Sequence, residues 1–193
     1  MTTTQFYNPK TITQEVPINF DSDIPPIEWI FNSIISENNY AMTTQPLHTI
    51  SGLWMEKFLS KTNELWCTNL RIPNLTGEIV GIELMLRIKR KSRIEDSIIQ
   101  LTLNNEVIGD NQASQIVPIH ANMYTGDNYF QDAVVPDDHI YGDDSFLWGT
   151  TNITFEQISD PTFGFVIGFR SNQEYPHRDL ACVEQVGLRI TYV

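Results

Sequence analysis

The sequence predicts an all-β protein, an antiparallel β-sandwich of jelly-roll or immunoglobulin-like type, and three observations favour this fold class. Several short stretches alternate apolar and polar residues with a period of two, which is typical of strands with one buried face. The chain supplies further strands of this kind in place of long helices. A sheet with one apolar face must be covered, and a second sheet is the simplest cover.

The clearest strands lie between residues 81 and 103. Two alternating runs, 82–88 and 99–103, flank the polar segment KRKSRIED. Their apolar positions are Ile82, Leu84, Leu86, Ile88, Ile99, Leu101 and Leu103. Because the second run repeats the alternation of the first, we expect the two to pair as an antiparallel hairpin with one buried face.

The N-terminal part has less regular patterns. Residues 1–26 are rich in Thr, Gln, Asn and Pro, which predicts an extended arm, with a short strand near 16–20, ahead of a single domain over 27–193. Apolar residues from Ile27 to Ile35 have helical spacing after two prolines, which predicts a short N-terminal helix. Strands are expected at 52–59 and 64–72, although 53–59 also fits a helical turn.

In the C-terminal half, the segment NNEVIGDN has the residues of a tight turn. A long acidic and aromatic loop is expected from Met123 to Asp144, which shows no sustained period. Thr154 and Gln157 have the spacing of a capping box for one helical turn, FEQIS, which Pro161 ends. Strands are expected at 163–169 and 186–192.

Charge and cysteine content narrow the function. The chain has 193 residues, with 24 acidic against 12 basic ones, and its formal charge of -12 opposes binding to nucleic acid and to anionic membranes. No apolar run approaches the roughly 18 residues that span a bilayer, and no secretion signal precedes the arm, so we expect a soluble protein made in the cytoplasm. Cys67 and Cys182 lack CxxC spacing, which favours buried thiols over a disulfide.

No catalytic or metal motif is present in the sequence. We find no GxSxG, GxxxxGK[ST] or HExxH pattern, and the scattered histidines form no metal-binding spacing. These histidines are His48, His120, His139 and His177. The pairs Asp137-Asp138 and Asp143-Asp144 could bind calcium, but solvated loop acids are the favoured interpretation. We therefore expect no cofactor and no enzymatic activity.

Ordered short phrases over residues 39–193 carry a resemblance to a known family. These phrases are Asn39-Tyr40-Ala41; Leu65, Asn69, Ile72 and Pro73; Ile79, Gly81, Ile82 and Glu83; Asp96, Ile99, Leu101, Gly109, Asn111 and Ala113; Tyr141-Gly142; Leu147 to Thr151; Ile158; Phe163 to Phe165; Ala181 to Val186; Ile190 and Tyr192. In their order they resemble a β-sandwich family of structural proteins from tailed bacteriophages and prophages. The loops around 116–146 are longer and more acidic than is typical of that family.

The resemblance implies a non-enzymatic virion protein, a capsid decoration, neck, tail or fibre-associated subunit that is assembled in the host cytoplasm. It implies binding to other virion proteins through sandwich-end loops and the N-terminal arm. It also implies homo-oligomerisation, as a trimer or a ring.

The sequence itself suggests where such contacts would form. Five of the twelve basic residues lie between Arg87 and Arg93, a docking patch for an acidic neighbour such as the acidic loop of another copy, or else a solvated strand end. Loop aromatics add candidate anchors. The full candidate interface is Arg87, Lys89, Arg90, Lys91, Arg93, Tyr124, Tyr129, Phe130, Asp137, Asp138 and Tyr141.

Two other functions remain open at this point. The four tryptophans and the loop aromatics could form a platform on which a surface glycan stacks, which would make the chain a carbohydrate-binding module. Trp148 is better interpreted as a core plug. A hydrolytic depolymerase would require two carboxylates that meet only in space.

Overall fold

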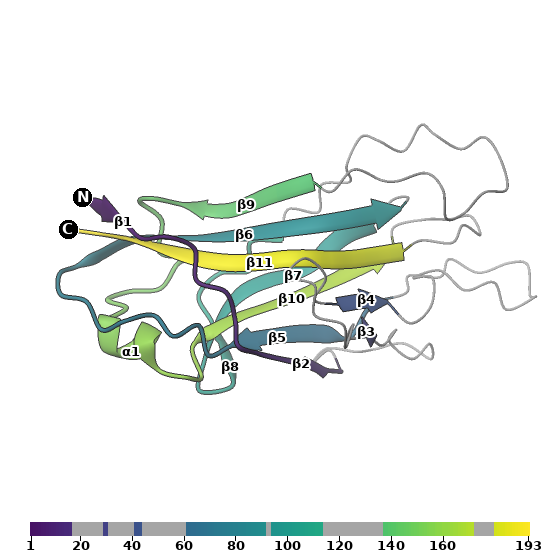
Figure 1. The fold of residues 1–193 in the computed structure, drawn as a ribbon, viewed down its shortest axis with the longest axis horizontal. Helices are drawn as coiled ribbons and strands as arrows, with labels where there is room; N and C mark the ends of the chain where they lie inside the picture. The colour runs from purple at the N-terminus through teal and green to yellow at the C-terminus, as the bar shows by residue number, and fades with distance from the viewer. Residues whose placement is uncertain (17–28, 31–40, 44–60, 92–93, 114–136, 172–179) are drawn as a thin grey trace, which may run out of the picture.

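The computed structural model describes residues 1–16, 29–30, 41–43, 61–91, 94–113, 137–171 and 180–193. Two antiparallel sheets pack against each other along their length, and one short helix lies beside the ends of several strands (Figure 1). The first sheet runs in the order β3 (Trp29–Ile30), β4 (Ala41–Thr43), β11 (Leu180–Tyr192), β6 (Ile79–Lys91) and β9 (Asp137–Asp143), with β1 (Thr2–Thr3) also on β11. The second runs β2 (Thr11–Glu15), β5 (Glu64–Thr68), β10 (Gly164–Ser171), β7 (Ile94–Leu103) and β8 (Glu106–Ile108).

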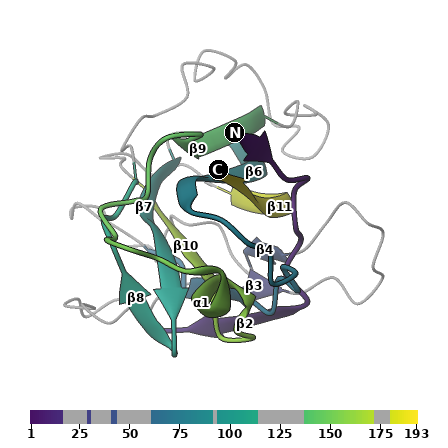
Figure 2. The same ribbon diagram turned by 90° about the vertical axis from the view of Figure 1, so that its left-hand side faces the viewer.

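The described strands from β4 to β11 have jelly-roll connectivity. The order β4-β11-β6-β9 in the first sheet faces β5-β10-β7-β8 in the second. The end-on view shows β9, β6, β11 and β4 in one layer and β10, β7 and β8 in the other (Figure 2). Each successive strand in this series changes sheet, apart from the pair β7 and β8. The predicted β-sandwich is therefore confirmed, and of the two predicted connectivities the jelly roll is the one observed.

The predicted hairpin of residues 81–103 is wrong in its pairing, although both strands exist. Strand β6 pairs with β11 and β9, whereas β7 pairs with β10 and β8 in the opposite sheet. A hairpin and two facing strands have the same alternation of buried and exposed positions. The pattern therefore predicts which face is buried but does not identify the neighbouring strand.

The inward faces of both sheets form the hydrophobic core. Ile82, Leu84 and Leu86 of β6 are completely buried, as are Ile99 and Leu101 of β7. Residues from β10 and β11 fill the centre; they are Phe165, Ile167, Phe169, Val183, Val186, Leu188 and Ile190. A β-bulge between Val183 and Gln185 turns both Val183 and Val186 inward despite their odd spacing.

One N-terminal prediction requires correction. Trp29–Ile30 is a strand, β3, that pairs antiparallel with β4, so these residues are not part of the predicted helix; the rest of 27–35 lies outside the described residues. Cross-strand pairing here overrides a helical spacing that only a few residues define. The predicted strand at 52–59 and most of that at 16–20 also lie outside the described residues.

Of the other local predictions, one strand is shorter than predicted and one turn is confirmed. The strand predicted at 64–72 ends at Thr68, because Asn69 and Arg71 have left-handed backbones with φ of 57° and 54°. Asn104 and Asn105 also have positive φ and make the tight turn between β7 and β8.

Helix α1 (Phe155–Ser159) has the predicted capping box. The Gln157 backbone N–H donates to the Thr154 hydroxyl at 3.3 Å, and the Thr154 backbone N–H donates to Gln157 Oε1 at 2.9 Å. The buried residues of this helix, Phe155 and Ile158, belong to the core.

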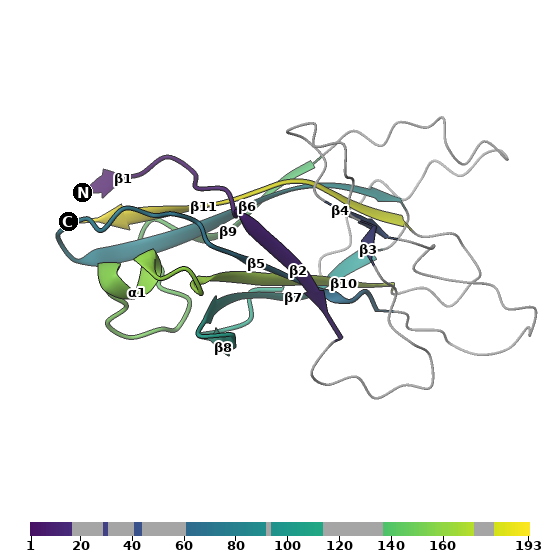
Figure 3. The same cartoon turned by 60° about the horizontal axis from the view of Figure 1, so that its bottom comes forward.

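The N-terminal arm links the two sheets of its own chain over its described part. Strand β1 pairs with β11, and Tyr7 exchanges backbone hydrogen bonds of 2.7 and 2.9 Å with Leu188. The chain then crosses to the other sheet, where β2 pairs with β5 (Figure 3). Gly187 permits the crossing, because a Cβ there would lie 3.0 Å from Asn8 Oδ1 and 3.2 Å from Phe6 Cβ.

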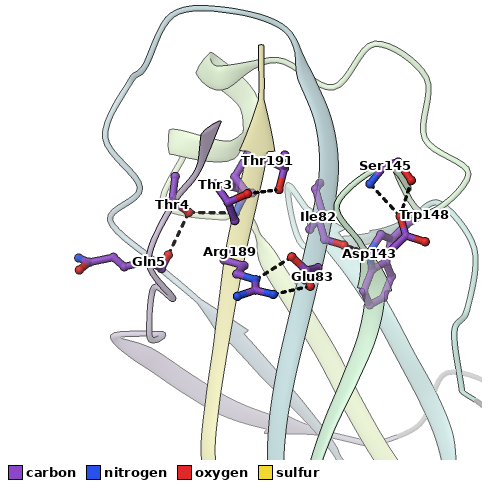
Figure 4. A network of polar contacts seen from close by, with 11 residues as sticks. Thr3, Thr4, Gln5, Ile82, Glu83, Asp143, Ser145, Trp148, Arg189 and Thr191 are labelled. Atoms are coloured by element: carbon purple, nitrogen blue, oxygen red, sulfur yellow. Dashed lines mark hydrogen bonds and ion pairs between the residues drawn. The ribbon is translucent and has the colours of Figure 1, made fainter. Parts of the chain in front are cut away.

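Trp148 is the core plug that the sequence predicts. Its side chain is fully buried, and its indole N–H donates to the Ile82 carbonyl at 2.8 Å (Figure 4). Its backbone has a φ of 56°, which is unusual for a bulky residue. Gly142, with a φ of 78°, makes room for the ring, because a Cβ there would lie 2.6 Å from the indole nitrogen.

We predict that Trp148→Phe lowers the free energy of unfolding by about 1–3 kcal/mol, because the buried Ile82 carbonyl loses its donor and the smaller ring leaves a void. Urea denaturation followed by circular dichroism measures the change. Val193→Ala, at an exposed residue, is the control and should alter stability by less than about 0.5 kcal/mol. Equal stability of Trp148→Phe and wild type would contradict the role of the plug.

Candidate functional site

The structure places the predicted interface residues in three groups. Four of them lie outside the described residues, namely Arg93, Tyr124, Tyr129 and Phe130. Lys89, Arg90 and Lys91 continue β6 opposite residues 182, 181 and 180 of β11, so they belong to a central strand and not to a hairpin end. The remaining residues lie on or beside β9, which the sequence interprets as loop.

Arg87 and Asp138 come together within one chain. They are register partners in β6 and β9, with Arg87 Nε 3.7 Å from Asp138 Oδ1. Their side chains are 42% and 58% exposed. The predicted attraction between the basic cluster and the acidic segment therefore exists, but here it joins neighbouring strands of the same sheet. Asp137 starts β9 and is the register partner of Ile88.

Tyr141 lies in the core and not on the surface where the sequence places it. It is 7% exposed, and its hydroxyl donates to Asp96 Oδ2 at 2.5 Å. Asp96 belongs to β7 and is buried, so this bond joins the two sheets across the sandwich. A carboxylate buried at this depth requires such donors.

The outer surface of β6 and β9 forms an exposed face with an apolar centre. Because Leu84 and Leu86 point inward, the alternating residues of β6 point outward, and the register places each beside one residue of β9. The resulting rows are Glu83 with Gly142, Met85 with Ile140, and Arg87 with Asp138. We call these six residues the β6–β9 face. Ile140 is 50% exposed, one of the few large exposed apolar residues among those described.

A partly buried ion pair joins Glu83 of this face to Arg189 of β11. Arg189 donates to both carboxylate oxygens of Glu83, at 2.6 and 2.7 Å, and these bonds raise the pKa of the Arg189 guanidinium (Figure 4). The Phe6 ring covers the guanidinium at 4.8 Å. Phe6 of the N-terminal arm thus covers part of the outer surface of β11, whereas Met85, Arg87, Asp138 and Ile140 keep exposed surface.

The outer surface of the second sheet differs, because its centre is buried, although Thr13 is exposed and Gln100 is partly exposed. Val166 and Thr102 point away from the core yet have no exposed surface, and Trp66 is also buried. Trp148 and Tyr141 of the predicted glycan platform are buried as well, whereas Phe146 is partly exposed.

Glu64 is a buried acid on that second outer surface. Burial raises the pKa of its carboxyl group, although the Trp66 indole N–H and the Lys61 ammonium partly lower it. One carboxylate oxygen, Oε2, has no hydrogen-bond partner. The ionised form of Glu64 therefore costs stability in the folded protein.

The described residues contain no group of three potential metal ligands from His, Cys, Asp and Glu. The Asp143 carboxylate accepts hydrogen bonds from the backbone N–H and hydroxyl of Ser145 at 2.7 and 2.8 Å, which lower its pKa and close a local turn (Figure 4). Cys67 is a free thiol, and burial raises its pKa. No helix in the described part of the chain has the length and apolarity to cross a membrane.

Comparison of the chain with known protein families, curated proteins and solved structures finds no match. Its function must therefore be inferred from its residues and their geometry.

Sequence reasoning missed that 137–143 is a strand. Asp and Gly are rare in strands, so DDHIYGD resembles a loop. The alternation of His139 and Tyr141 with Asp138 and Ile140 is the signal that could have predicted this strand. Asp138 and Ile140 are the exposed residues of the alternation.

We predict that Glu64→Gln stabilises the protein at neutral pH. The pKa of the Glu64 carboxyl group is higher in the folded state than in the unfolded state. At a pH between these two pKa values the folded state therefore binds more protons, and the stability of the wild-type protein falls as pH rises through this range. The gain should shrink as pH falls to the ordinary glutamate range, about 4 to 5, where the carboxyl group is protonated.

Urea denaturation at neutral and acidic pH measures this difference. Glu106→Gln, at an exposed residue of β8, is the matched control and should show no gain. A Glu64→Gln variant less stable than wild type at neutral pH would show that the carboxylate is satisfied.

Proposed function

We propose that the chain is a non-enzymatic structural subunit of a tailed-bacteriophage virion, which binds neighbouring capsid, neck or tail subunits. The observation that carries the proposal is the β6–β9 face, on which exposed Ile140 and partly exposed Met85 lie between the charged row of Arg87 and Asp138 and the row of Glu83 and Gly142. Apolar centres with polar rims are typical of surfaces that bind other proteins.

The fold is compatible with this role. Jelly-roll sandwiches serve as viral capsid domains, and also as lectin domains, so the connectivity narrows the function without deciding it. The residues that carry the sequence resemblance support the virion alternative. Two of its phrases, Tyr141-Gly142 and Leu147 to Thr151, meet at the Trp148 plug, where they determine how the sandwich closes.

The proposal assigns binding to a rigid sheet face. The predicted loop contacts Tyr124, Tyr129 and Phe130 lie outside the described residues, and the described part of the N-terminal arm pairs with strands of its own chain. The β6–β9 face belongs to two long, hydrogen-bonded strands, so little conformational entropy would be lost when a partner binds there.

Glycan binding stays the alternative and is an outcome of the test. It requires aromatic rings exposed on one surface, whereas Trp66, Trp148 and Tyr141 are buried. No observation on the described residues favours it over protein binding.

A reconstruction of particles from the phage or prophage that encodes the chain tests the proposal. We expect density for the sandwich at the capsid, neck or tail, with Ile140 against another subunit. Particles assembled with Ile140→Asp should contain less of the chain than particles assembled with Val16→Asp, a control at an equally exposed apolar residue. Absence of the chain from purified particles, or turnover of a polysaccharide that a single carboxylate change abolishes, would contradict it.

A further inference from the structure

We propose that the β6–β9 face binds the same face of a second copy, around a twofold axis that runs parallel to the strands between β6 and β9. The inference rests on the proposed function, a subunit held by other subunits, and identifies one partner as a second copy of this chain.

The register makes the face complementary to itself. A twofold rotation about that axis places β6 of one copy over β9 of the other and keeps each residue in its row. Arg87 then faces Asp138 of the second copy, and Met85 faces its Ile140. Two of the three rows therefore meet their complements, with opposite charges at one end of the face and apolar side chains in the middle, while Glu83 faces Gly142 of the second copy.

The apolar row would supply the affinity of such a dimer. Ile140 is half exposed and Met85 partly exposed in the single chain, so both have apolar surface left to bury. Sheets that pack face to face lie about 10 Å apart, a separation that side chains of this size fill.

The charged row would set the register. In one copy, Arg87 and Asp138 form an exposed pair, which contributes little to stability. In the dimer each carboxylate would lie beside two guanidinium groups, and a shift of one row would bring an apolar residue against a charge. Charge complementarity of this kind mainly determines specificity.

The net charge of the chain favours this face over other surfaces. Two copies, each with a formal charge of -12, repel each other in most orientations. The Arg87 and Asp138 row is locally neutral, and Glu83 is neutralised by Arg189. The N-terminal arm covers the adjacent surface of β11, which limits the contact to two strands. Interfaces of that size are at the small end of specific ones, so we expect a dimer that dissociates on dilution.

Sedimentation velocity of the full chain over a range of concentrations tests the inference with paired charge variants. Arg87→Asp places two carboxylates opposite each other in the dimer, and Asp138→Arg places two guanidinium groups opposite each other. Each variant alone should dimerise roughly tenfold or more weakly than wild type. An equimolar mixture of the two variants should recover the dimer, because both charged contacts between the copies in the mixed dimer again join opposite charges.

The mixture separates contact between chains from effects within one chain. Within each variant the two residues still have like charges, so recovery on mixing can come only from the contact between copies. Circular dichroism of each variant verifies that it folds, as expected for exposed positions. Lys10→Asp and Glu106→Arg make the same charge changes at exposed sites elsewhere and should leave dimerisation unchanged.

Three outcomes would overturn the inference: a wild-type chain that stays monomeric at the highest soluble concentration, a wild-type oligomer that neither variant weakens, or variants that fail to associate on mixing. The particle experiment is independent of these results. A monomer that is found in particles contradicts only the twofold contact and indicates a different partner for the face. A dimer that is absent from particles contradicts only the virion role.

Discussion

The structure depends on the burial of two alternating faces against each other. Ile82, Leu84 and Leu86 from one sheet and Ile99 and Leu101 from the other lose all their exposed surface, and burial of such side chains is the main favourable term in folding. Most other features of the described chain maintain this contact. The bulge in β11 preserves the inward direction of Val183 and Val186, and the Tyr141 to Asp96 bond joins the sheets at their edge.

Two buried polar side chains inside the sandwich each donate a hydrogen bond to a buried acceptor. The Trp148 indole N–H reaches the Ile82 carbonyl, and the Tyr141 hydroxyl reaches the Asp96 carboxylate. These two residues come from segments next to each other, and Gly142 between them accommodates the plug. Tyr141 and Trp148 thus act in closing the fold, whereas Met85, Arg87, Asp138 and Ile140 lie on the outer surface of β6 and β9.

Binding and stability use opposite sides of the same strands. Inward residues of β6 and β9 pack in the core, and outward ones form the β6–β9 face. A period of two therefore allows the outer residues to change with little effect on the core. Within the described part of the N-terminal arm, Phe6 lies over Arg189 of β11, whereas Ile140 and Asp138 of β9 are exposed.

The sequence by itself determined the all-β class, the alternating buried positions of 82–88 and 99–101, the capping box of α1 and the role of Trp148, because each depends on neighbours close in the chain or on simple alternation. Only the tertiary structure decided that β6 and β7 lie in opposite sheets, that DDHIYGD is a strand and that Arg87 meets Asp138. Strand neighbours depend on contacts between distant residues, and local patterns are the same for several pairings. The β6–β9 face was half predictable for this reason: Arg87 and Asp138 stand out by charge, whereas Met85 and Ile140 become a surface only when the register brings them together.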